Sequence, residues 1–427
     1  MRKIIAFLLA LFVFAPAHAL SIINDTQVEK LLYKVITPVA TAANVPENRL
    51  KIHIVNDDDF NAFVSGGEDV YIYTGLLTRI ENVNALQAVV AHELGHMVGG
   101  HMAQMSARMD AELKRTLLIQ ALGVGLMVAG GNPSLGAGVM AGAGGIAQQS
   151  MLAFSRDEER IADDIAVDLL VKANVNPNGL ITVFEQMQNI TGAAEAKINK
   201  NKTNHPLTTE RLKNARDKIA KVKHSGKYTT YSDTEYDLAR AKLIGYLYKE
   251  NQILDKYPYR KTDDASVYAR SIANMRGGAL DAARMGVLTL IQRDKNNPYY
   301  YELLGDIEYQ LGHYDASVTA YERALKLDKS APQIQTALAL VLAERNKPGD
   351  TERGISLCKE SLLTESAPLT YWVLAKLYKD GRSYWALAEF YNMNGDTKKA
   401  KKFAKQAQKN LKKDDPEYIK AGDILDM

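Results

Sequence analysis

Residues 89–98 read Val89-Val90-Ala91-His92-Glu93-Leu94-Gly95-His96-Met97-Val98, an apolar helical pattern that contains the motif His-Glu-x-x-His. On a helix, His92 and His96 lie one turn apart on the same face, close enough to reach one metal ion. Glu93 is turned about 100° around the helix, where it can act on a metal-bound water without ligating the metal. This arrangement is typical of zinc hydrolases, which take a third ligand from elsewhere. The alternative is two buried structural histidines beside an unrelated glutamate.

The length and composition of the chain limit which class of protein it can be. At 427 residues the chain is too long for one ordinary hydrophobic core, so we expect two or three domains. Its apolar fraction of 46% and charged fraction of 24% are those of a soluble globular protein. The net charge of +3 argues neither for nor against nucleic acid, which we do not expect among its partners. Cys358 is the single cysteine, so any metal must be held by histidine and carboxylate.

The first 19 residues have the pattern of a secretory signal peptide. A basic start, Arg2-Lys3, precedes an apolar run over residues 4–14, and Ala17-His18-Ala19 is a small-x-small cleavage site. The apolar run is too short to span a bilayer, which argues against a membrane anchor. No cysteine follows the site, so lipid attachment there is excluded. We expect cleavage after Ala19 and release into the periplasm.

Before the motif, the pattern predicts a helix and a short sheet. Residues 20–45 have helical periodicity. Residues 50–55 alternate as a strand does, and residues 70–73 predict a second strand after a turn at Gly66-Gly67. An edge strand beside an active site can pair with an extended substrate through main-chain hydrogen bonds, and we expect the substrate along residues 70–73. The alternative is a purely structural hairpin.

The motif helix is expected to run from Asn82 to about Met109. A longer signature, H-E-x-x-H-x-x-G-x-x-H, would supply the third zinc ligand locally, and Gly99 falls on its glycine position. The final position is Met102, however, and His101 comes one residue early. We therefore interpret His101 as a polar residue on the continuing helix and expect the third ligand elsewhere.

Residues 155–163, Ser-Arg-Asp-Glu-Glu-Arg-Ile-Ala-Asp, offer a carboxylate on a later helix. Glu159 and Asp163 would lie one turn apart there. Glu159 can bind zinc, while Asp163 can accept a hydrogen bond from the far nitrogen of a ligand histidine, which fixes the ring and raises its basicity. The spacing alone leaves Glu158 and Asp164 as competing choices.

Several motifs agree with one family. They are His92-Glu93-Leu94-Gly95-His96, Ser155-Arg156-x-x-Glu159-x-x-Ala162-Asp163, Asn61-Ala62-Phe63, Tyr73-Thr74-Gly75-Leu76-Leu77 and Thr203-x-His205-Pro206-x-x-x-x-Arg211. Together they resemble the HtpX-type gluzincin peptidases and, with a signal peptide in front and helical repeats behind, the periplasmic BepA-type branch. The resemblance implies a zinc endopeptidase with one Zn²⁺ per chain, ligands His92, His96 and Glu159, and Glu93 as general base. It also implies that misfolded or stalled outer-membrane proteins are substrates and that the repeats dock the barrel-assembly machinery.

Residues 116–155 contain no charged side chain and are rich in glycine and alanine. Gly131-Asn132-Pro133 divides the segment into two pieces that are each short for a bilayer. We favour two closely packed helices or a lid over the active site, because a glycine-rich backbone is costly to order. A membrane hairpin, and with it peripheral membrane contact, is the alternative.

His205 precedes a helix expected over residues 207–221, which carries Arg211. Four roles compete for His205: stabilising the oxyanion in the transition state, closing the site as an extra zinc ligand, a surface position, or a buried structural one. The family resemblance favours the two functional roles. Arg211 can stabilise developing negative charge, and an ordinary salt bridge is the alternative.

After a linker over residues 221–233, helices repeat. Two copies fit the tetratricopeptide pattern through Tyr301, Leu304, Gly305, Gly312, Tyr321 and Ala324, and through Tyr384, Leu387, Ala388, Tyr391, Gly395, Ala400 and Ala407. Weaker copies start near Tyr268 and Gln333, so we expect about four helix pairs, whose aromatics are mostly core and whose concave surface binds a partner. The lysine-rich stretch 398–413 is interpreted as a solvated face, with attraction to an anionic partner as the alternative.

The expected fold is mostly α, with a zincin-like α+β metalloprotease domain that contains a small sheet, followed by an α-solenoid of tetratricopeptide repeats. The expected boundaries are a signal peptide at 1–19, the protease domain at 20–225, a linker and connecting helix at 226–265, and the repeats at 266–427. The expected function is periplasmic proteolysis of outer-membrane proteins with assistance to their assembly. The alternative is a repeat-based chaperone or assembly factor in which proteolysis is secondary or auto-inhibited.

Overall fold

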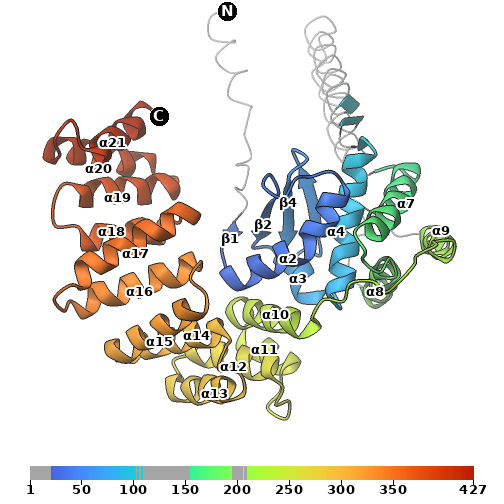
Figure 1. Ribbon diagram of the computed structural model, residues 1–427, viewed down its shortest axis with the longest axis horizontal. Coiled ribbons are helices and arrows are strands. Elements are labelled where there is room, and N and C mark those ends of the chain that lie inside the picture. The colour runs from blue at the N-terminus through green and yellow to red at the C-terminus, as the bar shows by residue number, and fades with distance from the viewer. Residues whose placement is uncertain (1–20, 102, 105–106, 109–153, 195–204, 206–208) are drawn as a thin grey trace, which may run out of the picture. The chain divides into compact units, whose positions relative to one another are not determined.

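The computed structural model describes residues 21–101, 103–104, 107–108, 154–194, 205 and 209–427 (Figure 1). It divides into two compact units: the first extends to Ser232, and the second comprises Asn24–Leu31 and Asp233–Met427. The expected signal peptide and nearly all of the glycine-rich segment lie outside the described residues. None of the described helices combines the length and the apolar character that crossing a membrane requires.

A four-stranded mixed sheet lies in the first unit, with the strand order β1-β2-β4-β3. Its strands are β1 (Ile22–Ile23), β2 (Lys51–Val55), β3 (Ala62–Ser65) and β4 (Asp69–Tyr73). β2 is parallel to β4, whereas β3 and β4 form an antiparallel hairpin whose turn contains Gly66 and Gly67 at φ values of 60° and 82°. The two strands predicted at residues 50–55 and 70–73 are confirmed, and the sequence pattern missed β1 and β3.

The expectation that a substrate pairs with residues 70–73 is wrong. These residues form β4, which is hydrogen-bonded on both sides, to β2 and to β3. Among the described strands, β3 pairs only with β4 and lies at the end of the sheet. A peptide that extends this sheet through main-chain hydrogen bonds on that side must therefore pair with β3.

Six described helices belong largely to the first unit. They are α2 (Thr26–Ala42), α3 (Thr74–Arg79), α4 (Val83–Val98), α7 (Arg156–Lys172), α8 (Gly179–Ala194) and α9 (Thr209–Ala220). α2 confirms the helix expected within residues 20–45, and its side chains Leu32, Val35 and Ile36 are fully buried. α4 carries the motif and contacts β3, α7 and α8, so it lies between the sheet and these two helices.

The motif helix is shorter than predicted. α4 ends at Val98 instead of continuing to about Met109, because Gly99 is its C-terminal cap and Gly100 has a φ of 72°. A positive φ is strained for residues with a Cβ and common for glycine after a helix end. Contrary to the sequence interpretation, His101 therefore does not lie on a continuation of α4, and its side chain is buried, with 2% of its area exposed.

The second unit consists of helices stacked in sequence order (Figure 1). They are α10 (Asp233–Leu247), α11 (Glu250–Lys256), α12 (Asp264–Arg276), α13 (Leu280–Arg293), α14 (Pro298–Gln310), α15 (Tyr314–Leu327), α16 (Pro332–Arg345), α17 (Asp350–Thr364), α18 (Pro368–Leu377), α19 (Arg382–Met393), α20 (Thr397–Asn410) and α21 (Pro416–Asp426). The ten helices α12 to α21 make five pairs where the repeat pattern predicts about four, because that pattern did not mark α18 and α21. Tyr268 and Tyr321 are core residues, as expected.

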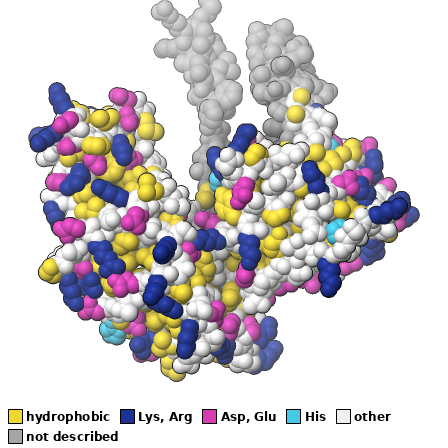
Figure 2. Space-filling model, viewed as in Figure 1, with side chains coloured by type: hydrophobic (Ala, Val, Ile, Leu, Met, Phe, Trp, Pro, Cys, Tyr) yellow, Lys and Arg dark blue, Asp and Glu magenta, His cyan; other side chains and the backbone are white. Residues whose placement is uncertain are grey.

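The visible surface of the second unit is mixed in charge. On the face drawn in Figure 2, basic and acidic side chains are interspersed along with apolar ones. Within the lysine-rich helix α20, Ala400, Ala404 and Ala407 are buried while Lys398, Lys402 and Lys405 are exposed. This is the arrangement of a solvated helix face, as the sequence interpretation has it.

A pH-dependent contribution to stability is expected from Glu29, which belongs with the second unit. Burial and the nearby carboxylate of Glu365 raise the pKa of Glu29 from its ordinary 4.5 to about 7. The folded state therefore holds this proton more tightly than the unfolded state, and stability is lost as the pH rises from about 4.5 through about 7. The Glu29→Gln variant, whose amide oxygen can still accept the hydrogen bond from the Asp25 amide, should match the wild type at pH 5. At pH 8 it should be more stable by about 1–2 kcal/mol, a figure that allows for the remaining solvent exposure.

Urea unfolding at pH 5, 6.5 and 8 measures this effect on the full chain. Glu250→Gln, at the exposed start of α11, is the matched control and should show no growing difference with pH. A constant difference between Glu29→Gln and wild type across this range would contradict the expectation.

Candidate metal centre

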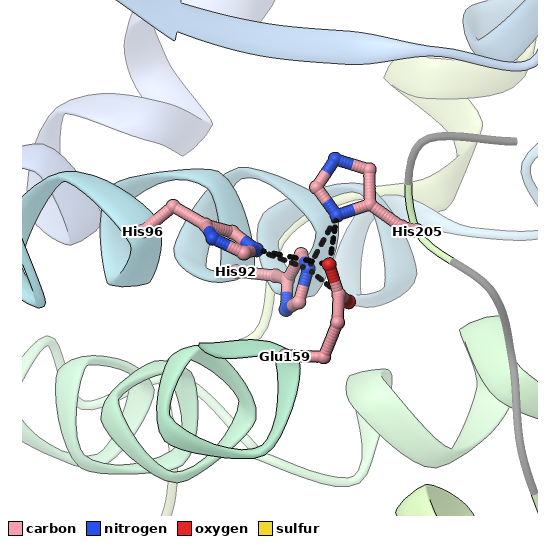
Figure 3. Close-up of side chains that lie close together, drawn as sticks. All are labelled: His92, His96, Glu159 and His205. Atoms are coloured by element: carbon pink, nitrogen blue, oxygen red, sulfur yellow. Dashed lines mark hydrogen bonds and ion pairs between the residues drawn. The ribbon is translucent and has the colours of Figure 1, made fainter. Parts of the chain in front are cut away.

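The two motif histidines project from one face of α4 (Figure 3). The helix begins after Asn82, whose side chain accepts a hydrogen bond from the Ala85 amide at 2.9 Å and so caps the first turn. His92 and His96 lie one turn apart and are buried, with 7% and 1% of their areas exposed. Helix geometry thus holds both imidazoles side by side in a place largely removed from solvent.

Gly95 allows α7 to pack closely against the motif helix. A Cβ at this position would lie only 2.6 Å from the carbonyl oxygen of Ala162 on α7. A larger residue at position 95 would force the two helices apart. This close approach brings Glu159, one turn before Asp163 on α7, opposite the motif histidines.

Four side chains converge at this point (Figure 3). His92, His96, Glu159 and His205 each offer one ligand atom, and these atoms lie within 4.8 Å of one another. The Nε2 atom of His92 is 3.1 Å from Nε2 of His96 and 3.3 Å from Nδ1 of His205, and the latter is 2.8 Å from Oε1 of Glu159. Imidazole nitrogens and a carboxylate oxygen are ligands that divalent zinc prefers in proteins, so these residues fit a bound metal ion.

The electrostatics of the cluster favour a cation. Burial lowers the pKa of His96 to about 2, with help from charge repulsion by His92 and His205, so this ring is neutral and its Nε2 can ligate. Burial disfavours charge on His92 as well, but hydrogen bonds to Asp163 and Glu159 raise its pKa to about 9. Despite its burial, Glu159 has a pKa well below its ordinary value because of His205 and His92. The carboxylates therefore draw positive charge to the place where a metal would lie.

Asp163 and Arg211 form a buried network behind the histidines. Oδ1 of Asp163 lies 2.9 Å from Nδ1 of His92, the nitrogen that faces away from the cluster. Arg211, on α9, donates two hydrogen bonds of 2.8 Å to Asp163, and its Nη1 lies 2.6 Å from Oε2 of Glu159. The guanidinium of Arg211 thus forms salt bridges with two carboxylates, as the salt-bridge alternative for this residue expects. Asp163 lies where the sequence reasoning placed it.

The competing carboxylates lie elsewhere. Glu158 is the third residue of a capping box: its Oε2 accepts from the Ser155 amide at 2.8 Å, and its Oε1 pairs with Arg108 at 2.7 Å. Asp164 faces Arg160 at the surface at 3.8 Å. The Ser-x-x-Glu capping pattern of residues 155–158 is readable in the sequence and could have excluded Glu158 as a ligand.

Glu93 lies beside the cluster and is not one of the four converging side chains. Its Oε1 atom is 3.7 Å from Nε2 of His205, and only 8% of its area is exposed. It lines a pocket that opens to solvent. This carboxylate therefore faces the space that a substrate would occupy.

The same cavity has mostly apolar walls that sequence reasoning missed. Its lining residues are Phe60, Asn61, Ala62, Leu76, Val89, His92, Glu93, Leu180, Val183, Phe184, Met187, His205 and Arg211. Phe60 and Asn61 lead into β3, Ala62 begins it, and four of the apolar residues come from α8. Apolar helix residues carry no chemical signature in a sequence, so only their position next to Glu93 identifies them.

Comparisons with known proteins agree with this geometry. The family model described as Peptidase family M48 matches residues 26–219, and one described as TPR repeat matches residues 305–345. The chain is 24% identical over 335 residues to the beta-barrel assembly-enhancing protease of Escherichia coli (strain K12), an alignment that covers 77% of this chain and 67% of that protein. It is 30% identical over 196 residues to metalloprotease YcaL of the same organism, with 45% of this chain and 71% of YcaL covered. It is also 27% identical over 191 residues to metalloprotease LoiP of Escherichia coli (strain K12), an alignment that covers 44% of this chain and 70% of LoiP.

Proposed function

The chain belongs to peptidase family M48, and we propose that it is a periplasmic zinc endopeptidase that degrades misfolded or stalled outer-membrane proteins and assists their assembly. The observation that carries this proposal is the convergence of His92, His96 and Glu159 beside Glu93. Similarity to the beta-barrel assembly-enhancing protease over 77% of this chain supports the substrate class. The signal-peptide pattern of residues 1–19 supports the compartment.

In the proposed mechanism, His92, His96 and Glu159 would hold a zinc ion. When bound, zinc lowers the pKa of a coordinated water and polarises the scissile carbonyl. Glu93 would take a proton from the attacking water onto its carboxylate and later deliver it to the nitrogen of the leaving amine. Asp163 accepts a hydrogen bond from Nδ1–H of His92, which leaves the lone pair of Nε2 directed at the ligand position.

The substrate is proposed to bind as an extended chain along β3. This strand pairs on one side only among the described strands, and the residues that lead into it line the cavity beside Glu93. The apolar wall from α8, including Val183, Phe184 and Met187, would accept an apolar substrate side chain. Such side chains are buried in folded proteins and accessible in unfolded ones. This geometry therefore favours misfolded or stalled chains as substrates.

The helical repeats are proposed to dock the barrel-assembly machinery. The TPR match at residues 305–345 supports a protein-binding role, because repeats of this kind present extended concave surfaces to partners. The name of the E. coli relative, which aligns over most of this chain, supports the choice of partner.

Removal of the metal tests the proposed activity. Treating the full chain with a chelator should abolish cleavage of an unfolded outer-membrane protein, and stoichiometric Zn²⁺ should restore it. Mg²⁺ should not, because it prefers oxygen ligands in octahedral geometry over imidazole nitrogen. Undiminished cleavage by protein shown to be metal-free would refute the metallopeptidase mechanism.

A closed state of the site is proposed from the position of His205. Its Nδ1 is among the four converging ligand atoms, and a fourth protein ligand fills the position that catalytic zinc sites leave open for water. This placement also favours the second candidate function, a chaperone or assembly factor with auto-inhibited proteolysis. Without this imidazole, the state in which the open position is free for water no longer competes with the state in which His205 fills it. The His205→Ala variant should therefore cleave unfolded protein roughly tenfold faster than wild type.

Initial rates at saturating zinc measure this effect. His313→Ala, at a largely exposed histidine of the second unit, is the control and should leave the rate unchanged. A lower rate for His205→Ala would instead assign His205 to transition-state stabilisation.

A further inference from the structure

His101 is a buried side chain that the proposed mechanism does not use. Its Nδ1 atom lies 3.1 Å from Nδ1 of His96, and 2% of its area is exposed. His96 directs its other nitrogen, Nε2, at the cluster, 3.1 Å from Nε2 of His92 and 3.5 Å from Oε1 of Glu159. The two nitrogens of His96 therefore face different partners, the ligand position on one side and His101 on the other.

The chemistry of a metal-binding imidazole determines which of the two rings donates the hydrogen bond between His96 and His101. A ring nitrogen that binds a metal must carry a free lone pair, so the proton of neutral His96 resides on Nδ1. That N–H can donate only to an acceptor, which here is the unprotonated Nδ1 of His101. We propose that His101 is a positioning residue that accepts this hydrogen bond and thereby fixes the ring and tautomer with which His96 meets the metal.

The backbone before His101 is built to bring its ring back to His96. On an uninterrupted helix, a residue five positions after His96 would lie about 140° around the axis and point away from it. Here Gly100, with a φ of 72°, turns the chain after the end of α4. Gly99 leaves room for the returning ring, since a Cβ at residue 99 would lie 2.7 Å from Nε2 and 2.9 Å from Cε1 of His101. Both glycines are thus required for the contact.

Phe154 packs against His96 beside its contact with His101. Its ring stacks on that of His96, with centroids 3.9 Å apart and planes 30° apart, and it is buried. An apolar ring against His96 limits access of water to the His96–His101 pair, and a hydrogen bond shielded from water is a stronger constraint. The two motif histidines therefore have different supports: a carboxylate, Asp163, faces His92, and an imidazole faces His96.

The test compares zinc affinities, because this inference rests on the proposed metal role of His96. The affinity of the full chain is measured by competition with a chromophoric chelator. The variant His101→Phe keeps an aromatic ring but has no acceptor, and it should bind zinc 10–100-fold more weakly. His101→Asn places an amide oxygen near the position of Nδ1 and should stay within a few-fold of wild type. Gly99→Ala keeps the imidazole but displaces it, and it should weaken binding in the same direction as His101→Phe.

Several outcomes would overturn the inference. Equal affinity of His101→Phe and wild type would show that His96 needs no acceptor, and an equal loss in His101→Phe and His101→Asn would assign the effect to packing. If His101→Phe does not fold, the zinc affinities of Gly99→Ala and His101→Asn are compared instead: the inference requires a loss in the first and near-wild-type affinity in the second. Gln104→Ala, at an exposed neighbouring position, is the control. Absence of zinc binding by the wild type would instead refute the proposed metal centre itself.

Discussion

Replacing Glu93 with glutamine is expected to slow cleavage of an unfolded outer-membrane protein by about 10²–10⁴-fold. Glutamine has the size of glutamate and retains a hydrogen-bonding oxygen, but it cannot take up the proton that the proposed mechanism assigns to this carboxylate. Glu93 is not one of the four side chains that converge on the metal position, so zinc binding should persist in the variant. Initial rates, together with the zinc content of the purified protein, measure both effects.

The same variant separates the two candidate functions. If proteolysis is the main role, cells that carry Glu93→Gln should assemble outer-membrane barrels as poorly as cells that lack the protein. If the repeats act as a chaperone, assembly should be unimpaired while cleavage is lost. Glu47→Gln, at an exposed glutamate before β2, is the control and should retain both activities. A rate for Glu93→Gln close to that of wild type would exclude this residue as the general base.

Asp163→Ala is expected to destabilise the first unit by about 3 kcal/mol, because it removes one partner from a buried ion pair. Arg211 has 6% of its area exposed and donates two hydrogen bonds to Asp163, so the substitution leaves a buried guanidinium with less of its charge compensated. His92 loses the carboxylate at 2.9 Å from its Nδ1 in the same step. Zinc affinity should therefore fall as well, by about 10–100-fold.

Urea unfolding of metal-free protein separates the two effects of this substitution, since the stability loss then contains no contribution from zinc. Asp164→Ala is the matched control one residue away. Asp164 faces Arg160 across 3.8 Å with 40% of its side chain exposed, and removing such a surface pair should cost about 0–1 kcal/mol. Equal stability of the two variants would show that the Asp163–Arg211 pair contributes nothing beyond a surface contact.

Much of the site could be predicted because its parts are local in sequence. His92 and His96 share a helix, and so do Glu159 and Asp163, so the helical repeat alone predicts which side chains face the same way. The mostly helical fold with a small sheet and tetratricopeptide repeats was predictable for the same reason and is confirmed. The metal ligand roles themselves stay predictions that the proposed experiments test.

Other parts were beyond sequence reasoning because they arise from contacts between distant residues. β4 pairs with both β2 and β3, so among the described strands the unpaired edge lies at residues 62–65 and not at residues 70–73. The pattern of a single strand does not reveal which strands will lie beside it. The apolar wall from α8 becomes a substrate wall only because it lies beside Glu93. The sequence pattern excludes His101 as the third zinc ligand because it comes one residue early, yet the turn at Gly99 and Gly100 brings its ring against His96.

Helical spacing in the sequence determined that His92 and His96 would form a pair, that Glu93 would lie beside them, and that Glu159 and Asp163 would share a helix face. Only the tertiary structure decided how closely Glu159 approaches that pair, that His205 reaches the same point from a separate segment, and that Arg211 closes the network behind it. The physical reason is the packing of α7 on α4 at Gly95, where the missing Cβ sets how closely the two helices approach. Periodicity describes one helix at a time, whereas a metal centre needs several elements at fixed distances from one another.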